Sequence, residues 1–138
     1  MSTPKIHRDI AYEGVPKVVM ARVVGAAATN ITQSTVSSLS YIVDQYDSED
    51  DAVQDANATS VTTETSLSPV SSYVYNALQT DNDWDADGTG YNLKVTLPAA
   101  SFPAGNKWNR VEIWVTPTSG EAFPGFVGIF EVIATTKD

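Results

Sequence analysis

A period of two in the last third of the chain restricts the fold more than any other feature. Apolar and aromatic side chains occupy every second position from Tyr91 to Leu97, with polar side chains between them. A similar alternation runs from Asn109 to Val115, where valine and isoleucine share one face. Side chains alternate between two faces in a strand, whereas the apolar residues of a helix recur every three or four positions. Both segments are therefore predicted to be β-strands.

Further strands are predicted upstream and at the end of the chain. They are Val15 to Val24 (apolar on both faces), Thr35 to Tyr46, Thr59 to Leu67 (an edge strand), Val70 to Leu78 (either a strand or one short turn of helix) and Phe126 to Ala134. Asp47 to Asn57 is interpreted as an acidic loop, and no segment has a convincing helical period. Short strands separated by turn residues predict an all-β fold, an antiparallel β-sandwich over residues 15–138.

Residues 1–14 are interpreted as an extended N-terminal arm. Ile6, Ile10 and Tyr12 are apolar, but they follow no sustained period. Such a segment is frayed unless something holds it. We therefore expect the arm to reach over an adjacent subunit or to fold back on its own domain.

Charge and composition exclude several classes of function. The net charge of −9 repels a phosphate backbone, and no cluster of lysine or arginine offsets it, so direct nucleic-acid binding is not expected. The chain has no cysteine, which removes disulfides and thiol catalysis. The longest apolar stretch, Val15 to Ala28, is interrupted by charges, proline and glycine, so no membrane span is expected.

Apolar side chains are too many for a sandwich with one buried face per sheet. If Val111, Ile113 and Val115 face the core, the opposite face of that strand and of the last strand carries large side chains: Trp108, Arg110, Trp114, Val127 and Ile129. Large apolar patches on an outer face mark interaction sites. Together with Ile6, Ile10 and Tyr12 of the arm, these residues are the predicted interface. The alternative is that the arm or a long loop covers this face within one monomer.

A run of alternating aspartates suggests a second kind of site. Asp83, Asp85 and Asp87, followed by Gly88, match the first half of a calcium-binding loop. The second half of the motif does not match, because Lys94 occupies the position at which a bidentate glutamate completes the coordination of calcium. The sequence leaves open a partial calcium site, a sugar-directed site with Trp84 at its tip, and a plain aspartate-rich turn in which Trp84 plugs one end of the sandwich.

No combination of residues predicts catalysis. His7 is the only histidine and lies in the arm, and no serine stands in a nucleophile motif. Carboxylate pairs for glycoside hydrolysis can be drawn from the loops, but these acids lack the apolar surroundings that raise a pKa. We therefore expect a protein that is not an enzyme and needs no cofactor, with calcium as the one candidate.

The run from Tyr91 to Phe123, YNLKVTLPAASFPAGNKWNRVEIWVTPTSGEAF, carries a resemblance to a known group. A strand ends on Leu-Pro, a loop of small residues crosses over, and an aromatic-led strand closes on a glycine turn. In this respect residues 74–116 resemble Ig-like β-sandwich modules of small phage virion proteins, and the N-terminal third shows no match.

The resemblance implies a structural virion component, made in the host cytoplasm. Capsid decoration is the preferred role, and a head–tail connector or tail-associated protein is the alternative within the particle. Its partners would be the major capsid protein or another virion protein, and copies of itself. A calcium- or carbohydrate-binding β-sandwich module remains the rival outside the particle.

Overall fold

The computed structural model describes residues 6–25 and 28–136, whose regular structure is almost entirely β-strand. Two sheets are formed, with strand orders β1-β8-β7-β3-β4 and β2-β6-β5. The elements are β1 (Ile6–Tyr12), β2 (Lys17–Ala21), β3 (Val36–Tyr46), α1 (Glu49–Gln54), β4 (Thr59–Leu67), the 3-10 turn η1 (Val70–Ser72), β5 (Val74–Gln79), β6 (Tyr91–Leu97), the 3-10 turn η2 (Ala99–Ser101), β7 (Lys107–Pro117) and β8 (Phe123–Ile133).

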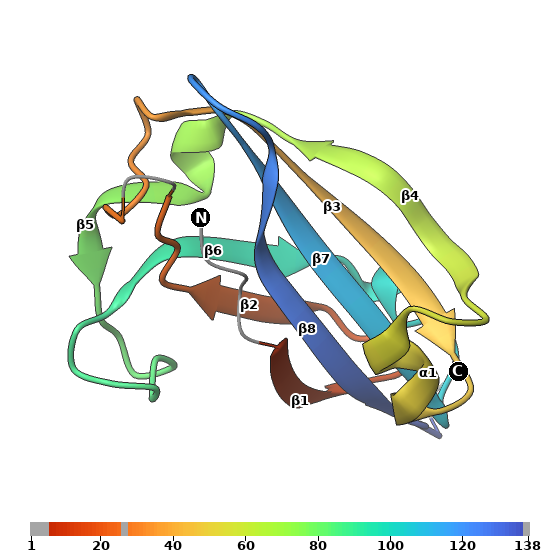
Figure 1. The fold of residues 1–138 in the computed structure, drawn as a ribbon. Helices are drawn as coiled ribbons and strands as arrows, with labels where there is room; N and C mark the ends of the chain where they lie inside the picture. Colours follow the sequence, from red (N-terminus) through yellow and green to blue (C-terminus); the bar gives the residue numbers. More distant parts are fainter. Residues whose placement is uncertain (1–5, 26–27, 137–138) are drawn as a thin grey trace.

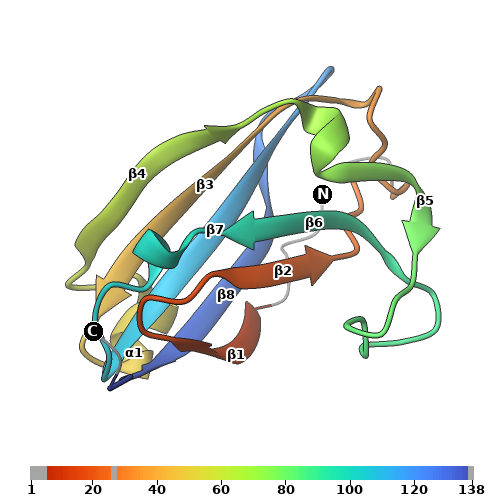
Figure 2. The ribbon, with the colours of Figure 1, turned by 180° about the vertical axis from the view of Figure 1, so that it is seen from behind.

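The two sheets lie in separate layers, and their strands cross at a marked angle (Figures 1 and 2). The inner faces supply one hydrophobic core. Side chains from both layers are fully buried there, among them Val43, Val74, Leu97, Val111, Ile113, Val115 and Phe102. The alternation that predicted β6 and β7 is confirmed, since Leu93, Val95 and the aliphatic side chains of β7 all face this core.

One buried polar side chain ties the smaller sheet to the segment that follows β2. The Oδ1 of Asn92 accepts a hydrogen bond from the Val23 amide at 2.7 Å, and its Nδ2 donates to the carbonyl of Val23 at 2.9 Å and of Ile31 at 3.3 Å. Asn92 is only 1% exposed, so these bonds satisfy groups that water does not reach. They fix the path of the chain beyond the end of β2.

The N-terminal segment differs from the expected arm in its described part. Residues 6–12 form β1, which pairs in parallel with β8 of the same chain and becomes an edge of the five-stranded sheet. Ile6 lies beside Val127, and Tyr12 lies beside Ile133. Residues 1–5 of the expected arm lie outside the described residues. The arm thus folds back on its own domain over the part that the structure describes.

The acidic segment after β3 also differs from its interpretation as a loop, because residues 49–54 form the short helix α1. Ser48 caps the N-terminus by accepting a hydrogen bond from the Asp51 amide at 3.1 Å, and Asp55 ends the helix in a left-handed conformation. Serine followed three residues later by an acidic residue is a helix-start signal, and it could have predicted this helix.

Candidate functional site

The outer face of the five-stranded sheet is covered at one end by α1. A second, smaller hydrophobic cluster lies beneath the helix; it consists of Tyr46, Ala52 and Ile129, with Ile6, Val53 and Trp108 packed against it. Ile129 is 0% exposed and Val127 is 5% exposed. The prediction that these two side chains are exposed on an outer face is therefore wrong, although they do point to that face.

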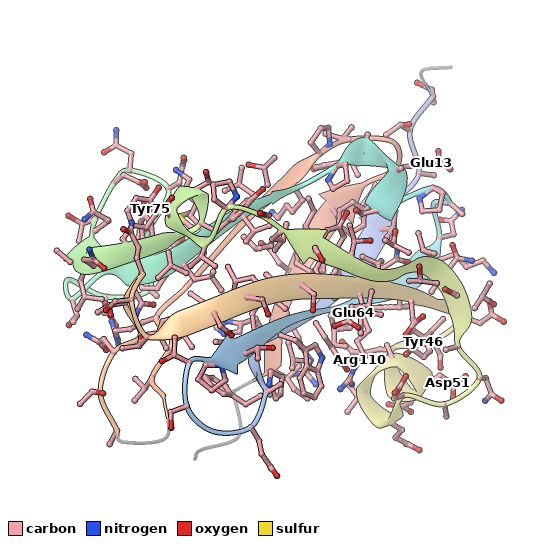
Figure 3. All side chains as sticks on the ribbon, turned by 90° about the horizontal axis from the view of Figure 1, so that it is seen from above. Glu13, Tyr46, Asp51, Glu64, Tyr75 and Arg110 are labelled. Atoms are coloured by element: carbon pink, nitrogen blue, oxygen red, sulfur yellow. The ribbon has the colours of Figure 1, made fainter. Side chains whose placement is uncertain are left out.

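Arg110 holds the helix in this position. Its Nη1 donates hydrogen bonds to the carbonyl oxygens of Ala52 and Val53 at 2.9 and 3.1 Å, and its Nε pairs with Glu112 at 2.7 Å. Figure 3 shows Arg110 and Tyr46 beside the helix that carries Asp51. A cation at the carbonyl end of a helix also complements the helix dipole. Arg110, predicted as an interface anchor, is thus engaged within its own chain.

Trp114 lies on the same face of β7, further from α1. Its indole Nε1 donates a hydrogen bond to Glu112 at 2.9 Å, and its strand neighbours are Ser40 and Pro124. Trp114 and Trp108 are both half-buried. Trp114 therefore remains a partly exposed aromatic side chain on the face where the sequence predicted it.

Among the carboxyl groups of the described residues, that of Asp44 has a raised pKa. Burial is the main cause, followed by the neighbouring negative charges of Asp55 and Glu112, while the charge of Arg110 acts in the opposite direction. Asp44 lies directly beside Arg110 on the sheet. A raised pKa can mark a catalytic acid, but this carboxyl belongs to the polar network around α1.

The most exposed apolar side chains come from a different part of the chain. The four large hydrophobic residues that are most exposed are Ile10 at 44%, Tyr12 at 53%, Val15 at 43% and Val18 at 40%. All four belong to the nine-residue stretch from β1 through the turn into β2, and we call them the apolar edge. β1 and β2 are the end strands of the two sheets, so this stretch forms one open side of the molecule.

A cleft of about 550 Å³ opens along the same side. Its walls come from β1, β2 and the loop between β5 and β6, and its floor comes from β8. The lining residues are His7, Arg8, Asp9, Pro16, Lys17, Val18, Val19, Met20, Asp83, Trp84, Asp85, Ala86, Phe126 and Phe130. His7 stacks on Phe126 with ring centres 5.0 Å apart, and Lys17 joins Asp9 at 3.0 Å, linking β2 to β1.

The carboxylates of the aspartate-rich loop are not grouped in the way that a calcium site would require. Both carboxylate oxygens of Asp87 accept hydrogen bonds from the guanidinium of Arg22, at 3.0 and 2.8 Å, and backbone amides of Thr89 and Gly90 donate to it as well. These donors, Arg22 first, hold the pKa of Asp87 well below its usual range. In the described residues no three acidic or histidine side chains come together as a metal site requires. Asp83, Asp85 and Asp87 are therefore not gathered around one cation.

Trp84 and Tyr91 form an aromatic pair at the base of this loop, with ring centres 5.6 Å apart. The hydroxyl of Tyr91 donates to Asp81 at 2.6 Å, and this bond raises the pKa of Tyr91 to about 12. Lys94 approaches the same carboxylate at 3.5 Å. Lys94, which stands in the last ligand position of the suggested calcium motif, instead neutralises Asp81.

Sequence reasoning missed the cleft and two members of the apolar edge, Val15 and Val18. The signal was weak, because an alternating valine-rich segment has the same appearance whether its strand is central or at an edge. Which edge of the strand stays unpaired depends on how distant segments pair.

Scans against protein-family models, curated proteins and solved structures found no match for this chain. No helix among residues 6–25 and 28–136 has the length and hydropathy of a membrane span. The fold and the site define the chain as an all-β protein built from two packed sheets, with an apolar edge and an adjoining cleft.

Proposed function

We propose that this chain is a non-enzymatic structural protein of a phage particle, an Ig-like β-sandwich that docks on the capsid or on neighbouring subunits through its apolar edge. One observation carries the proposal: the large exposed apolar side chains of the described residues lie on one nine-residue stretch at the open side of both sheets. Side chains such as Ile10 and Tyr12 gain free energy when a partner removes them from water.

The strand order supports the Ig-like part of the proposal. Strands β8, β7, β3 and β4 follow one another as strands G, F, C and C′ do in a variable-type immunoglobulin sheet, and β2, β6 and β5 follow one another as B, E and D do. Strand β1 joins the first of these sheets in parallel with β8.

The position of the apolar edge changes the expected mechanism of docking. Ile129 lies under α1, and Arg110 binds the helix, so neither contributes a free anchor. Ile10 and Tyr12 take that role on β1, and Trp114 is a further contact on the outer face. Decoration of a capsid is the preferred role, and a connector or tail-associated role uses the same edge.

The test is association with a candidate capsid, followed by size-exclusion chromatography with light scattering. The parent chain is expected to co-elute with capsid shells or to self-associate. A double variant, Ile10→Ser with Tyr12→Ser, should fold normally and lose at least about tenfold in affinity, since buried interface anchors typically contribute 2 kcal/mol or more. Tyr75→Ser, on the edge strand β5 of the other sheet, is the matched control. A parent chain that stays monomeric and binds neither capsid nor virion protein contradicts the proposal.

A ligand-binding module is the second candidate, because the cleft brings Trp84, Asp83 and Asp85 together. An indole beside hydrogen-bonding carboxylates is a common surface for sugars and for cationic side chains. Calcium dependence is not favoured, given the engagement of Asp87 by Arg22. A calcium titration that leaves the melting temperature unchanged would remove the calcium form of this candidate.

A further inference from the structure

The cleft lies between two strand edges that have no neighbour in the described residues. β1 ends the order of the five-stranded sheet, and β2 ends the order of the three-stranded sheet. Backbone amide and carbonyl groups at such an edge can pair with an added strand. On β1 the amide of Ile10 already donates to the Asp9 side chain at 2.8 Å, so β2 offers the less obstructed edge.

The charges that line the cleft are not balanced. Arg8 pairs with Glu49 at 3.4 Å, and Lys17 pairs with Asp9. The carboxylates of Asp83 and Asp85 make no hydrogen bond or ion pair within the part of the chain that the structure describes. Asp83 and Asp85 both line the cleft, whereas Asp81 and Asp87, which have cationic partners, do not. The cleft therefore presents two unpaired negative charges.

The surroundings of these carboxylates suit a long cationic side chain. Trp84 lies between them in sequence and lines the same cleft, with Phe126 and Phe130 at the floor. Lysine and arginine bury an apolar stem while keeping the charge near acceptors, and their cations are attracted to an indole face. A single ammonium or guanidinium group needs fewer carboxylates than a calcium ion, which takes six or more oxygen ligands.

We propose that the cleft binds an extended segment of a partner protein that carries lysine or arginine. The segment adds as a strand to the free edge of β2 and places a basic side chain between Trp84 and the carboxylates of Asp83 and Asp85. Charge complementarity selects this occupant, since the chain itself has a net charge of −9. The inference rests on the proposed docking function and assigns the chemistry of the partner.

The test uses a synthetic nine-residue peptide of alternating valine and lysine, with valine–serine and valine–glutamate peptides of equal length. Binding is measured by isothermal titration calorimetry at about 0.1 M salt, where the attraction between the charges is only partly screened. We expect the valine–lysine peptide to bind, and the other two to bind at least about tenfold more weakly. N-methylation of alternate peptide amides removes strand donors, and the copy methylated on the edge that faces β2 should not bind.

Matched variants separate a specific site from general attraction to an acidic protein. Asp83→Asn with Asp85→Asn should raise the Kd of the valine–lysine peptide about tenfold. Asp50→Asn with Glu121→Gln changes the net charge equally, at exposed positions outside the cleft, and should leave the Kd within about twofold. Equal weakening by both pairs of substitutions, or equal binding of the valine–serine peptide, overturns the proposal.

Two further outcomes distinguish this inference from the docking function. Ile10→Ser with Tyr12→Ser should retain peptide binding while capsid association falls, because these side chains do not line the cleft. If these substitutions abolish capsid association but the parent chain binds no peptide, the docking function stays in place and the proposal of a cationic segment is refuted. Binding of a neutral oligosaccharide such as cellotetraose, in place of the peptide, refutes it in favour of a sugar site.

Discussion

Replacement of Arg110 by alanine is expected to destabilise the protein by about 3 kcal/mol. The side chain is 16% exposed, so its charge is only partly solvated. The substitution removes two charge-assisted hydrogen bonds to the helix carbonyls and leaves Glu112 without its ion-pair partner. Hydrogen bonds of this kind contribute about 1.5–3 kcal/mol each, and water can replace part of those to the carbonyls. The expected loss of about 3 kcal/mol is therefore smaller than the full contributions of the two hydrogen bonds and the ion pair added together.

Urea unfolding followed by tryptophan fluorescence measures this free energy. A loss of about 3 kcal/mol lowers the melting temperature by roughly 10 °C for a domain of this size, and the chain should remain folded at 25 °C. Detachment of α1 should also expose Tyr46 and Ile129, which an increase in the fluorescence of a bound hydrophobic dye reports. Arg110→Lys keeps the charge but not the forked geometry, so its loss should be smaller.

Arg8→Ala is the control, because Arg8 also pairs with α1 but is 54% exposed opposite a glutamate that is 41% exposed. Exposed pairs of this kind contribute about 0.5 kcal/mol or less. If Arg110→Ala costs no more than Arg8→Ala, or if dye binding does not change, the reasoning that Arg110 holds the helix over the outer face is refuted.

Three other measurements check the packing and the electrostatics. Asn92→Ala leaves the Val23 amide and the Ile31 carbonyl without their partner, while the Val23 carbonyl still accepts from the Ile31 amide. The substitution should destabilise by about 3 kcal/mol in urea unfolding, whereas a value below about 1 kcal/mol would contradict the structural role of Asn92. Gly105→Ala places a new Cβ 2.4 Å from the Cα of Ala134, so a loss of about 2 kcal/mol is expected, and an unchanged melting temperature would exclude this contact. The lowered pKa values of Glu13 and Asp87 stabilise the folded state at neutral pH, and this stabilisation is lost as pH falls below about 4, towards the pKa values of the folded state. Asp87→Asn should therefore reduce the difference in unfolding free energy between pH 7 and pH 3, and an undiminished difference would assign the acid sensitivity to other groups.

Much of the site could not be predicted from local pattern. Ile10 and Tyr12 were predicted as interface residues and lie on the apolar edge, but their role as a docking surface stays a prediction. Ile129 has the same apolar character, yet it is covered, because a helix from elsewhere in the chain lies over it. Sequence shows that a side chain points outward; it does not show what lies above it.

The aspartate loop illustrates the same limit. Alternating carboxylates from Asp83 to Asp87 have the spacing of a calcium loop, and the spacing is a property of the sequence alone. Arg22 lies 65 positions before Asp87 and takes both of its oxygens, which no local motif could indicate. The pairing of sheets brought the two residues together.

The sequence by itself determined most of the strands and their two faces, although not β1, because the alternation of side chains follows from the geometry of an extended backbone. The inward positions of β6 and β7 could be assigned for that reason. Tertiary structure alone decided that β1 pairs in parallel with β8, that α1 covers one end of the outer face, and that a cleft opens between β1 and β2. These outcomes depend on contacts between residues far apart in the chain, whose free energies no short window of sequence contains.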